Sequence, residues 1–157
     1  MKDLIIRKGG IDDLTQIKNL FFDTVKSICS TDYSNEQIGA WLRGNEDQKR
    51  WTNMVNTQVL LVATKNNEIL GFCSLANSNY VDFLFVHKNY QNLGIAKKLY
   101  SAIEDEAIRN KQEQLSADVS ITAKSFFEKN GFRIIKEQTA VRDGCALTNF
   151  KMIKSLI

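Results

Sequence analysis

YVDFLFVHKNYQNLGIAKKLYSAIEDEA, residues 80–107, is the most informative stretch of the chain. Its first seven residues, Tyr80–Val86, are almost all apolar and rich in β-branched and aromatic types, which predicts a strand buried on both faces. Later in the stretch, apolar residues recur at intervals of three and four, as they do in an amphipathic helix. We therefore expect a strand, a turn and a helix that form one unit. The inward stripe of the helix comprises Ile95, Leu99, Ala102, Ile103 and Ala107.

The turn between this strand and helix has the features of a phosphate site. Its sequence is QNLGIA at residues 91–96, with no side chain at Gly94 and only a methyl group at Ala96. The backbone can therefore come close to a ligand. The first N–H groups of a helix have no partner within it, and they lie at the positive end of the helix dipole. Together these properties predict a site for an anion, above all a phosphate group.

Length and composition indicate one ordinary globular domain, residues 1–157. Apolar residues make up 43% of the chain and charged residues 25%, and the formal net charge is only +3. Basic residues form no run, so we expect no nucleic-acid partner. No apolar run approaches the length that spans a membrane, and no signal-peptide core precedes the first strand. We therefore expect no membrane contact and a cytoplasmic location.

The cysteine pattern argues against a metal site. Cys29, Cys73 and Cys145 are far apart and odd in number, and the chain has one histidine. Structural zinc sites need four ligands, usually Cys and His at close spacing. We therefore expect no metal, and reduced thiols that pack as small apolar side chains.

Periodicity along the chain predicts seven strands and several helices. Strands are expected at residues 4–8, 58–64, 68–75, 80–86, 114–119, 132–137 and 147–153. Helices are expected from Asp12 or Asp13 to about residue 28, at 35–43, from 95 to about 109 and at 122–130, with only a short helical turn at 48–56. No repeat, low-complexity segment or linker interrupts this order. We therefore expect an α/β domain, of the α+β type, with a mixed sheet covered by helices.

A second block, SITAKSFFEKNGF at residues 120–132, makes the interpretation of the turn more specific. Neither the dinucleotide-binding pattern G-x-G-x-x-G nor the P-loop pattern is present, which excludes two common phosphate-binding folds. The chain instead resembles the GNAT superfamily of acetyl-CoA-dependent N-acetyltransferases over nearly its whole length. The family's turn signature has Gln or Arg, then Gly, then Gly or Ala, at the spacing of Gln91, Gly94 and Ala96. The family's later block is matched by Ala123, Phe126, Gly131 and Phe132.

The resemblance implies a mostly antiparallel sheet of about seven strands with helices on both faces, and acetyl-CoA as co-substrate. The pyrophosphate would bind backbone N–H groups of the turn, and pantetheine would lie along the open edge of the strand at Leu84–Val86. A backbone N–H near Leu84–Phe85 would polarise the thioester carbonyl while the substrate amine attacks it directly. The residues expected to bind the cofactor are Leu84, Phe85, Val86, Gln91, Asn92, Leu93, Gly94, Ile95, Ala96, Lys97, Ser120 and Phe127.

Two departures from the family pattern bear on the chemistry. The family's Asn at the start of the later block is Ser120, which can still cap the following helix and contact the cofactor. The tyrosine that often protonates the leaving thiolate is Phe127, which has no proton to give. The proton for the thiolate would then come from Tyr33, Cys145 or water, or the reaction would proceed without a general acid. Tyr33 lies in a polar break between two helices and is also expected at the acceptor site.

Asp82 is the candidate general base. A carboxylate in a run of Val, Phe and Leu needs a partner or a function, and the family commonly has an acidic residue on this strand. Asp82 has the same parity along the strand as Leu84 and Val86, so we expect it on the same face. In one interpretation Asp82 takes a proton from the acceptor's ammonium group, directly or through water. In the other it is solvated or paired with a Lys or Arg; Arg50 itself is expected to be a solvated surface charge.

The function that the sequence favours is transfer of an acetyl group from acetyl-CoA to a primary amine of a small molecule or peptide, by a small bacterial member of the family. The alternatives are a non-catalytic acyl-CoA-binding module, since Phe127 replaces the usual acid, and a protein that binds another nucleotide at the same turn. The acceptor pocket is expected at residues 21–51 and 139–149, whose mixed charges do not identify the amine. Exposed strand edges in this fold often pair, so a homodimer is a further expectation.

Overall fold

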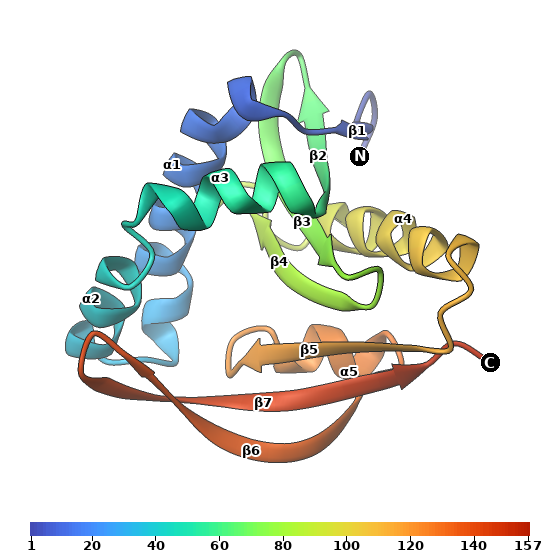
Figure 1. Ribbon diagram of the computed structural model, residues 1–157. Helices are drawn as coiled ribbons and strands as arrows, with labels where there is room; N and C mark the ends of the chain where they lie inside the picture. Colours follow the sequence, from blue (N-terminus) through green and yellow to red (C-terminus); the bar gives the residue numbers. More distant parts are fainter.

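A seven-stranded sheet with helices on both faces makes up the structure, a computed structural model that describes residues 1–157 (Figure 1). The strands are β1 (Ile5–Lys8), β2 (Val59–Lys65), β3 (Glu68–Ala76), β4 (Tyr80–Val86), β5 (Gln114–Ser120), β6 (Arg133–Arg142) and β7 (Cys145–Ser155). The helices are α1 (Leu14–Ser27), α2 (Asn35–Arg43), α3 (Gln48–Thr57), α4 (Ile95–Arg109) and α5 (Lys124–Lys129). Two short 3-10 turns, η1 (Ile11–Asp13) and η2 (Cys29–Thr31), flank α1.

The sheet opens between its two parallel strands. The strand order is β1-β2-β3-β4-β5-β7-β6, and every neighbouring pair is antiparallel except β4 and β5. These two strands share a single register position, Tyr80 opposite Ser116, and beyond it they separate. Strands β1–β4 therefore form one half of the sheet and β5–β7 the other (Figure 1). The predicted mixed, mostly antiparallel sheet is confirmed, and its opening lies directly beside β4.

Two apolar cores lie on opposite faces of the sheet. On one face α1, α2 and α3 pack through a cluster that includes Phe21, Trp51 and Phe72. On the other face α4 and α5 pack through a cluster that includes Leu99 and Phe127. Alternating side chains of the strands supply both clusters, as expected for a sheet that is covered on both sides. The predicted coverage by helices on both faces is confirmed.

Some elements are longer than the sequence predicted. α3 is a full helix rather than a helical turn, and it buries Trp51 and Met54 completely. β6 and β7 form a long hairpin whose turn is Asp143-Gly144, with positive φ values of 47° and 74°. Asp-Gly favours this two-residue turn. β6 is longer than predicted because it is an edge strand with mostly polar, exposed residues. Its sequence therefore lacks the clear alternation of apolar and polar residues that marks a strand.

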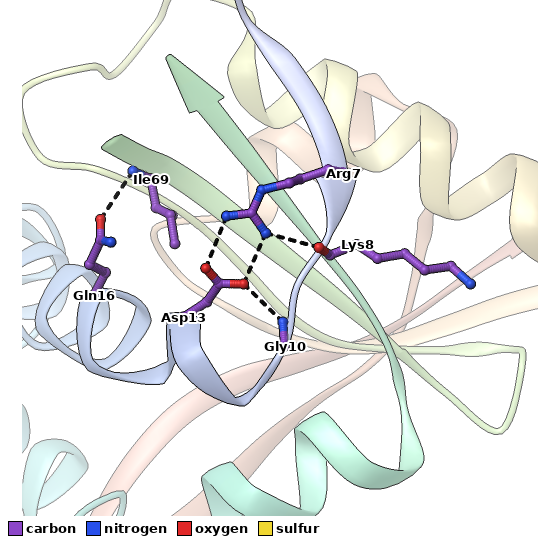
Figure 2. Close-up of polar contacts among 6 residues, drawn as sticks. All are labelled: Arg7, Lys8, Gly10, Asp13, Gln16 and Ile69. Atoms are coloured by element: carbon purple, nitrogen blue, oxygen red, sulfur yellow. Dashed lines mark hydrogen bonds and ion pairs between the residues drawn. The ribbon is translucent and has the colours of Figure 1, made fainter. Parts of the chain in front are cut away.

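Asp13 fixes the start of α1 against the sheet (Figure 2). Its carboxylate accepts hydrogen bonds from two nitrogens of Arg7, each at 2.9 Å, and from the backbone N–H of Gly10 at 2.9 Å. Further along the chain, Gln16 accepts a hydrogen bond from the backbone N–H of Ile69 at 3.3 Å. These contacts hold α1 on the sheet, and α1 in turn lines a cleft beside β4.

We expect Asp13→Asn to lower the free energy of unfolding by about 1 kcal/mol at neutral pH, the size of a partly exposed charge-assisted hydrogen bond. The hydrogen bonds from Arg7 hold the pKa of Asp13 below its usual range, although burial acts in the opposite direction. A lowered carboxyl pKa stabilises the fold above the unfolded-state pKa, and this contribution is lost as the pH falls through the folded-state pKa. The difference between wild type and Asp13→Asn should therefore be full above about pH 5 and should shrink progressively as the pH falls below the unfolded-state pKa.

Urea denaturation at several pH values measures this difference. Asp12→Asn is the matched control, because Asp12 is the neighbouring carboxylate and is exposed. We expect little change in stability for Asp12→Asn at any pH. A stability loss for Asp13→Asn that persists unchanged in acid would show that the charge of Asp13 is not its cause.

Candidate active site

The turn between β4 and α4 presents a row of unpaired backbone donors. None of the N–H groups from Leu93 to Lys97 donates a backbone hydrogen bond. Gly94 has a φ of +83°, a left-handed conformation that favours glycine, and a Cβ atom at this position would meet no atom within 4 Å. These donors lie at the N-terminus of a 15-residue helix, where Leu93 and Gly94 are exposed. This geometry fits a pyrophosphate group, because the donors are free and the helix dipole favours an anion.

Gln91, the first residue of the turn signature, is bonded within the protein. Its amide nitrogen donates hydrogen bonds to the carbonyl oxygens of Val86, at 2.7 Å, and of His87, at 3.3 Å. The hydroxyl of Thr24 donates to the same Val86 oxygen at 2.9 Å. The side chain of Gln91 therefore holds the turn against the end of β4. The Val86 carbonyl oxygen already has two donors, which leaves it poorly placed to accept a hydrogen bond from pantetheine.

Asn92 and Lys97 contribute to the shape of the turn. Asn92 has a positive φ of 61°, which redirects the chain just before Gly94. The ammonium group of Lys97 donates a hydrogen bond to the side-chain oxygen of Asn130 at 2.5 Å. Lys97 thereby links α4 to the end of α5. The part of the turn that faces a ligand is therefore its backbone rather than these side chains.

Alternate residues of β4 direct their backbone N–H groups away from β3, toward the opening. The N–H of His87 donates to the carbonyl of Leu70 at 2.8 Å, which fixes the hydrogen-bonding pattern of the antiparallel pair. Bonded positions alternate with unbonded ones, so Phe85 bonds to β3 while Leu84 and Val86 do not. Since β5 has already separated from β4, the N–H groups of Leu84 and Val86 are free along this edge. Of the two residues expected to polarise the thioester, only Leu84 has a suitable N–H.

A β-bulge changes which residues of β4 share a face. Ser74 and Leu75 are consecutive on β3, but their partners on β4 are two residues apart, so Asp82 has no partner. An extra residue in one strand disrupts the alternation at that point. Asp82 therefore lies on the face of Phe83, toward α3, and not on the face of Leu84. The face predicted for Asp82 was wrong.

The carboxylate of Asp82 is held by Arg50 of α3 and by Gln58, the residue directly after α3. Arg50 donates two hydrogen bonds to Asp82, at 2.9 and 3.1 Å, and Gln58 donates a third at 2.8 Å. The guanidinium group of Arg50 also lies over the ring of Phe83, 4.4 Å from its centroid. Asp82 is thus paired with a cation, the second of the two interpretations, and Arg50 is not the solvated charge that was expected. The role of Asp82 as a base stays a prediction, and its oxygens are already occupied.

A cleft of about 340 Å³ lies at the opening between β4 and β5 and reaches both faces of the sheet. On the side of α4 and α5 it is lined by Leu84, Val119, Ser120, Ala123 and Phe127. On the side of α1, α2 and α3 it is lined by Phe21, Tyr33, Trp41, Arg50, Asp82 and Arg142. The cleft therefore joins the free edge of β4 to the two regions, residues 21–51 and 139–149, that were expected to form the acceptor pocket.

Tyr33 lies in the cleft wall, but its hydroxyl group is fully engaged. The hydroxyl donates to the carbonyl of Thr148 at 2.6 Å and accepts from the N–H of Ile121 at 2.9 Å, which joins β7 to the end of β5. Burial raises the pKa of Tyr33, so the hydroxyl keeps its proton at neutral pH. These contacts favour a structural role for Tyr33 over the role of general acid. Cys145, the other candidate acid, does not line the cleft.

The later sequence block reaches the cleft through Ser120 and Phe127. The hydroxyl of Ser120 accepts a hydrogen bond from the N–H of Ala123 at 3.1 Å, so it caps the turn that leads into α5. Phe127 is only 5% exposed and packs edge-on against Phe126 and Phe132. Phe127 therefore gives the cleft an apolar wall and supplies no proton.

Polar residues that the sequence did not single out meet where β4 and β5 begin to separate. Tyr80 donates to one oxygen of Asp118 at 2.8 Å, and Gln138 donates to the other at 2.6 Å. Burial, together with the hydrogen bond to Asp118, raises the pKa of Tyr80. Asp118 forms no ion pair. The alternation of β5 was the available signal, because it places Asp118 on the face away from α4 and α5. Arg142 and Asn149 line the same cleft and were also missed.

The structure contains no metal-binding cluster, no helix suited to cross a membrane and no disulfide. No group of three or more His, Cys, Asp or Glu side chains is arranged to hold a metal ion. None of the helices is both long enough and apolar enough to cross a membrane. The three cysteines, Cys29, Cys73 and Cys145, are free thiols.

This structure combines three features: unpaired donors at the start of α4, a free strand edge on β4 and a cleft at the opening of the sheet. Together they suit an extended, phosphate-bearing ligand. The family model for the acetyltransferase (GNAT) domain matches residues 29–154. The chain belongs to the GNAT acetyltransferase family and is an acetyl-CoA-dependent N-acetyltransferase.

The chain is similar to its relatives over nearly its whole length. An Escherichia coli protein named as the uncharacterized N-acetyltransferase YafP is 36% identical over 152 residues, which are 97% of this chain and 96% of that protein. The crystal structure of a GCN5-related N-acetyltransferase from Rhodopseudomonas palustris is 29% identical, with a TM-score of 0.94, over 99% of this chain and 98% of that one. The PaiA N-acetyltransferase from Thermoplasma acidophilum, solved in complex with coenzyme A, shares the fold at 21% identity and a TM-score of 0.78, over 97% and 98% of the two chains. The resemblance inferred from residues 91–96 and 120–132 is confirmed.

Proposed function

We propose that this enzyme transfers the acetyl group of acetyl-CoA to a primary amine of a small molecule or peptide, by direct attack of the amine on the thioester. The observation that carries the proposal is a succession of free backbone donors along one unit, from Leu84 and Val86 on β4 to Leu93–Lys97 at the start of α4. These donors suit an extended ligand with a thioester and amides at one end and phosphates at the other. Acetyl-CoA has this form.

The chemical step uses groups that border the cleft. The N–H of Leu84 would stabilise the negative charge that develops on the thioester oxygen. The neutral amine nitrogen forms a bond to the carbonyl carbon, the carbon–sulfur bond breaks, and the coenzyme A thiolate leaves with the electron pair. The nitrogen of the new amide then gives up its extra proton to water. The ammonium form of the acceptor must first lose a proton to a base. We assign protonation of the thiolate to water, because Phe127 has no proton and the proton of Tyr33 is bonded to Thr148.

An assay with acetyl-CoA and a panel of primary amines tests this function. We expect each accepted amine to cause release of the coenzyme A thiol and to appear as its N-acetyl product in the mass spectrum. Binding of acetyl-CoA without transfer to any amine would favour the acyl-CoA-binding module instead. Tight binding of ATP with no binding of coenzyme A would favour a different nucleotide ligand.

Asp118, rather than Asp82, is expected to accept the proton of the acceptor. The oxygens of Asp82 are bonded to Arg50 and Gln58, whereas Asp118 is held by neutral donors only. We expect Asp118→Asn to lower kcat/KM by about a hundredfold. Asp82→Asn should lower kcat/KM much less. A larger loss in Asp82→Asn than in Asp118→Asn would restore Asp82 as the base.

We also propose a cytoplasmic enzyme that forms homodimers. Free thiols at Cys29, Cys73 and Cys145 suit a reducing compartment. β6 is an edge strand of the sheet and exposes the apolar side chains of Ile135 and Val141. A second copy of the chain would pair along such an edge. Light scattering of the purified protein gives the oligomeric state.

A further inference from the structure

Aromatic rings line the side of the cleft that faces α1 and α2. Trp41 of α2 and Phe85 of β4 both line the cleft and are partly exposed. Phe21 of α1 packs edge-on against both, with its ring centroid 6.4 Å from that of Trp41 and 4.9 Å from that of Phe85. Phe21 itself is only 1% exposed, so it supports the other two rings from behind. We call Phe21, Trp41 and Phe85 the aromatic recess.

The aromatic recess has the dimensions to take one more ring. Aromatic side chains contact one another at centroid distances of about 4.5–7 Å. The distances to Phe21 place the centroids of Trp41 and Phe85 no more than about 11 Å apart, so a ring between them can contact both. The ring contacts of Trp41 and Phe85 are all with other residues and not with each other.

The polar groups around the aromatic recess are engaged within the protein. The hydroxyl of Tyr33 donates one hydrogen bond and accepts another. Arg50 and Asp82 form an ion pair at 2.9 Å. Asp118 has Lys151 directly opposite it on β7, so a neighbouring cation offsets its charge. The recess therefore offers a ligand ring surface rather than an unpaired charge, which favours a ligand with a flat apolar part.

The walls of the cleft meet where α2 lies beside the turn of the β6–β7 hairpin (Figure 1). Gln37 of α2 donates a hydrogen bond to the carbonyl of Ala146 at 3.1 Å, and Arg43 of α2 forms an ion pair with Asp143 in that turn. The bond from Tyr33 to β7 adds a third link. An extended polypeptide could not pass through this end without breaking these contacts. The closed end therefore favours a small acceptor over a protein chain.

The aromatic recess lies close to the expected position of the thioester. Phe85 directly follows Leu84, whose N–H is the expected donor to the thioester oxygen, and the two Cα atoms are about 3.8 Å apart. A ring against Phe85 therefore needs only a short link, about one to three carbon atoms, to bring an amine to the thioester. The cleft has a volume of about 340 Å³ and must also hold the thioester, which leaves room for a small molecule only.

We propose that the acceptor is a small arylalkylamine, whose aromatic ring binds between Trp41 and Phe85 and whose amine reaches the thioester at Leu84. The inference rests on the proposed acetyl transfer to a primary amine, and it narrows the acceptor to an amine that carries one aromatic ring. Trp41 and Phe85 then determine which amine binds, and they take no part in proton transfer.

2-Phenylethylamine, 2-cyclohexylethylamine and ethylamine test the proposal, because all are primary amines but only the first carries an aromatic ring. Calorimetric titration into the protein with coenzyme A measures binding without turnover, and kcat/KM with acetyl-CoA measures the reaction. We expect wild type to bind 2-phenylethylamine roughly tenfold or more tightly than ethylamine, because a ring is buried. It should bind 2-phenylethylamine about two- to tenfold more tightly than 2-cyclohexylethylamine, because only an aromatic ring gains from contacts with other aromatic rings.

Substitutions in the aromatic recess show whether its rings cause this preference. Trp41→Leu and Phe85→Leu keep an apolar side chain but lose the ring, so each should remove most of the preference for the phenyl over the cyclohexyl compound. Trp41→Phe should keep most of it. Phe22→Leu is the matched control, because Phe22 also packs edge-on against Phe21, at 5.5 Å, but does not line the cleft. This variant should keep the whole preference, and thermal unfolding checks that each variant is folded.

The proposal is overturned if wild type binds the three amines equally, or if the cyclohexyl compound binds as tightly as the phenyl compound. It is also overturned if Trp41→Leu and Phe85→Leu both keep the wild-type preference. If the preference depends on these two rings but no N-acetyl product forms, the acetyl transfer is wrong and the ring site stands. If all three amines are acetylated with equal kcat/KM and bind equally, the acetyl transfer stands and the ring site is wrong.

Discussion

Gly94→Glu should abolish the stabilisation of the folded enzyme by acetyl-CoA. A ligand that binds only the folded state stabilises it by about 2.7 kcal/mol when its concentration is about 100 times Kd. The carboxylate of the new side chain would lie beside the free N–H groups of Leu93–Lys97, where the pyrophosphate is expected. Its negative charge repels the phosphates and its bulk fills their space, so the whole shift in Tm should disappear. Thermal unfolding with and without acetyl-CoA measures the effect.

Two variants separate this effect from backbone strain. Gly94→Ala has the same left-handed conformational cost, on the order of 1 kcal/mol, but adds no charge. Because no atom lies within 4 Å of a Cβ at Gly94, this variant should keep most of the ligand-induced shift. Gly144→Glu puts the same charge on another glycine with positive φ, +74°, at the turn between β6 and β7, and should leave the shift unchanged. A folded Gly94→Glu protein that still responds to acetyl-CoA would show that the phosphates bind elsewhere.

The turn and helix that we propose bind the cofactor could be predicted from the sequence because their geometry is local. A glycine turn that begins a helix determines its own free N–H groups within a few consecutive residues. The buried strand before the turn and the amphipathic helix after it are equally local patterns. The structure has both where they were expected, β4 at Tyr80–Val86 and α4 at Ile95–Arg109. Long-range contacts are not needed to place any of these residues.

The orientation of Asp82 could not be predicted, because it depends on another strand. The bulge arises where β3 and β4 pair with unequal numbers of residues, and the sequence of β4 alone does not mark it. Counting residues along the strand therefore placed Asp82 on the wrong face. Arg50 was misjudged for a related reason. Its partner Asp82 is 32 residues away in the sequence, and the helix that carries Arg50 was expected only as a turn.

The acceptor half of the site depends on the topology of the sheet. Tyr80, Asp118 and Gln138 come from β4, β5 and β6, and the strand order brings their side chains together. In the sequence Asp118 and Gln138 are polar residues in mixed segments, which is typical of ordinary surface. Only the fold shows that Tyr80 and Asp118 line one cleft. The lining of the acceptor region is therefore known only once the pairing of the strands is known.

Leu84→Pro should lower kcat by about 10²–10³ while the protein stays folded, which is the usual effect of removing one donor to a developing oxyanion. Proline has no N–H, and the N–H of Leu84 points into the opening rather than to β3. Proline is compatible with a strand only where the missing N–H faces away from a ladder partner. The loss should therefore appear in kcat at saturating acetyl-CoA, with only a modest change in Tm.

Leu84→Ala and Phe85→Pro are the controls for that experiment. Leu84→Ala keeps the N–H and loses the same partly buried side chain, so it should retain most of kcat. Phe85→Pro removes an N–H that bonds to β3, so it should disrupt the sheet. If Leu84→Pro kept the kcat of Leu84→Ala, the N–H of Leu84 could not be the oxyanion donor. Because the register directs the N–H of Phe85 to β3, polarisation of the thioester would then have to come from a side chain or from β5.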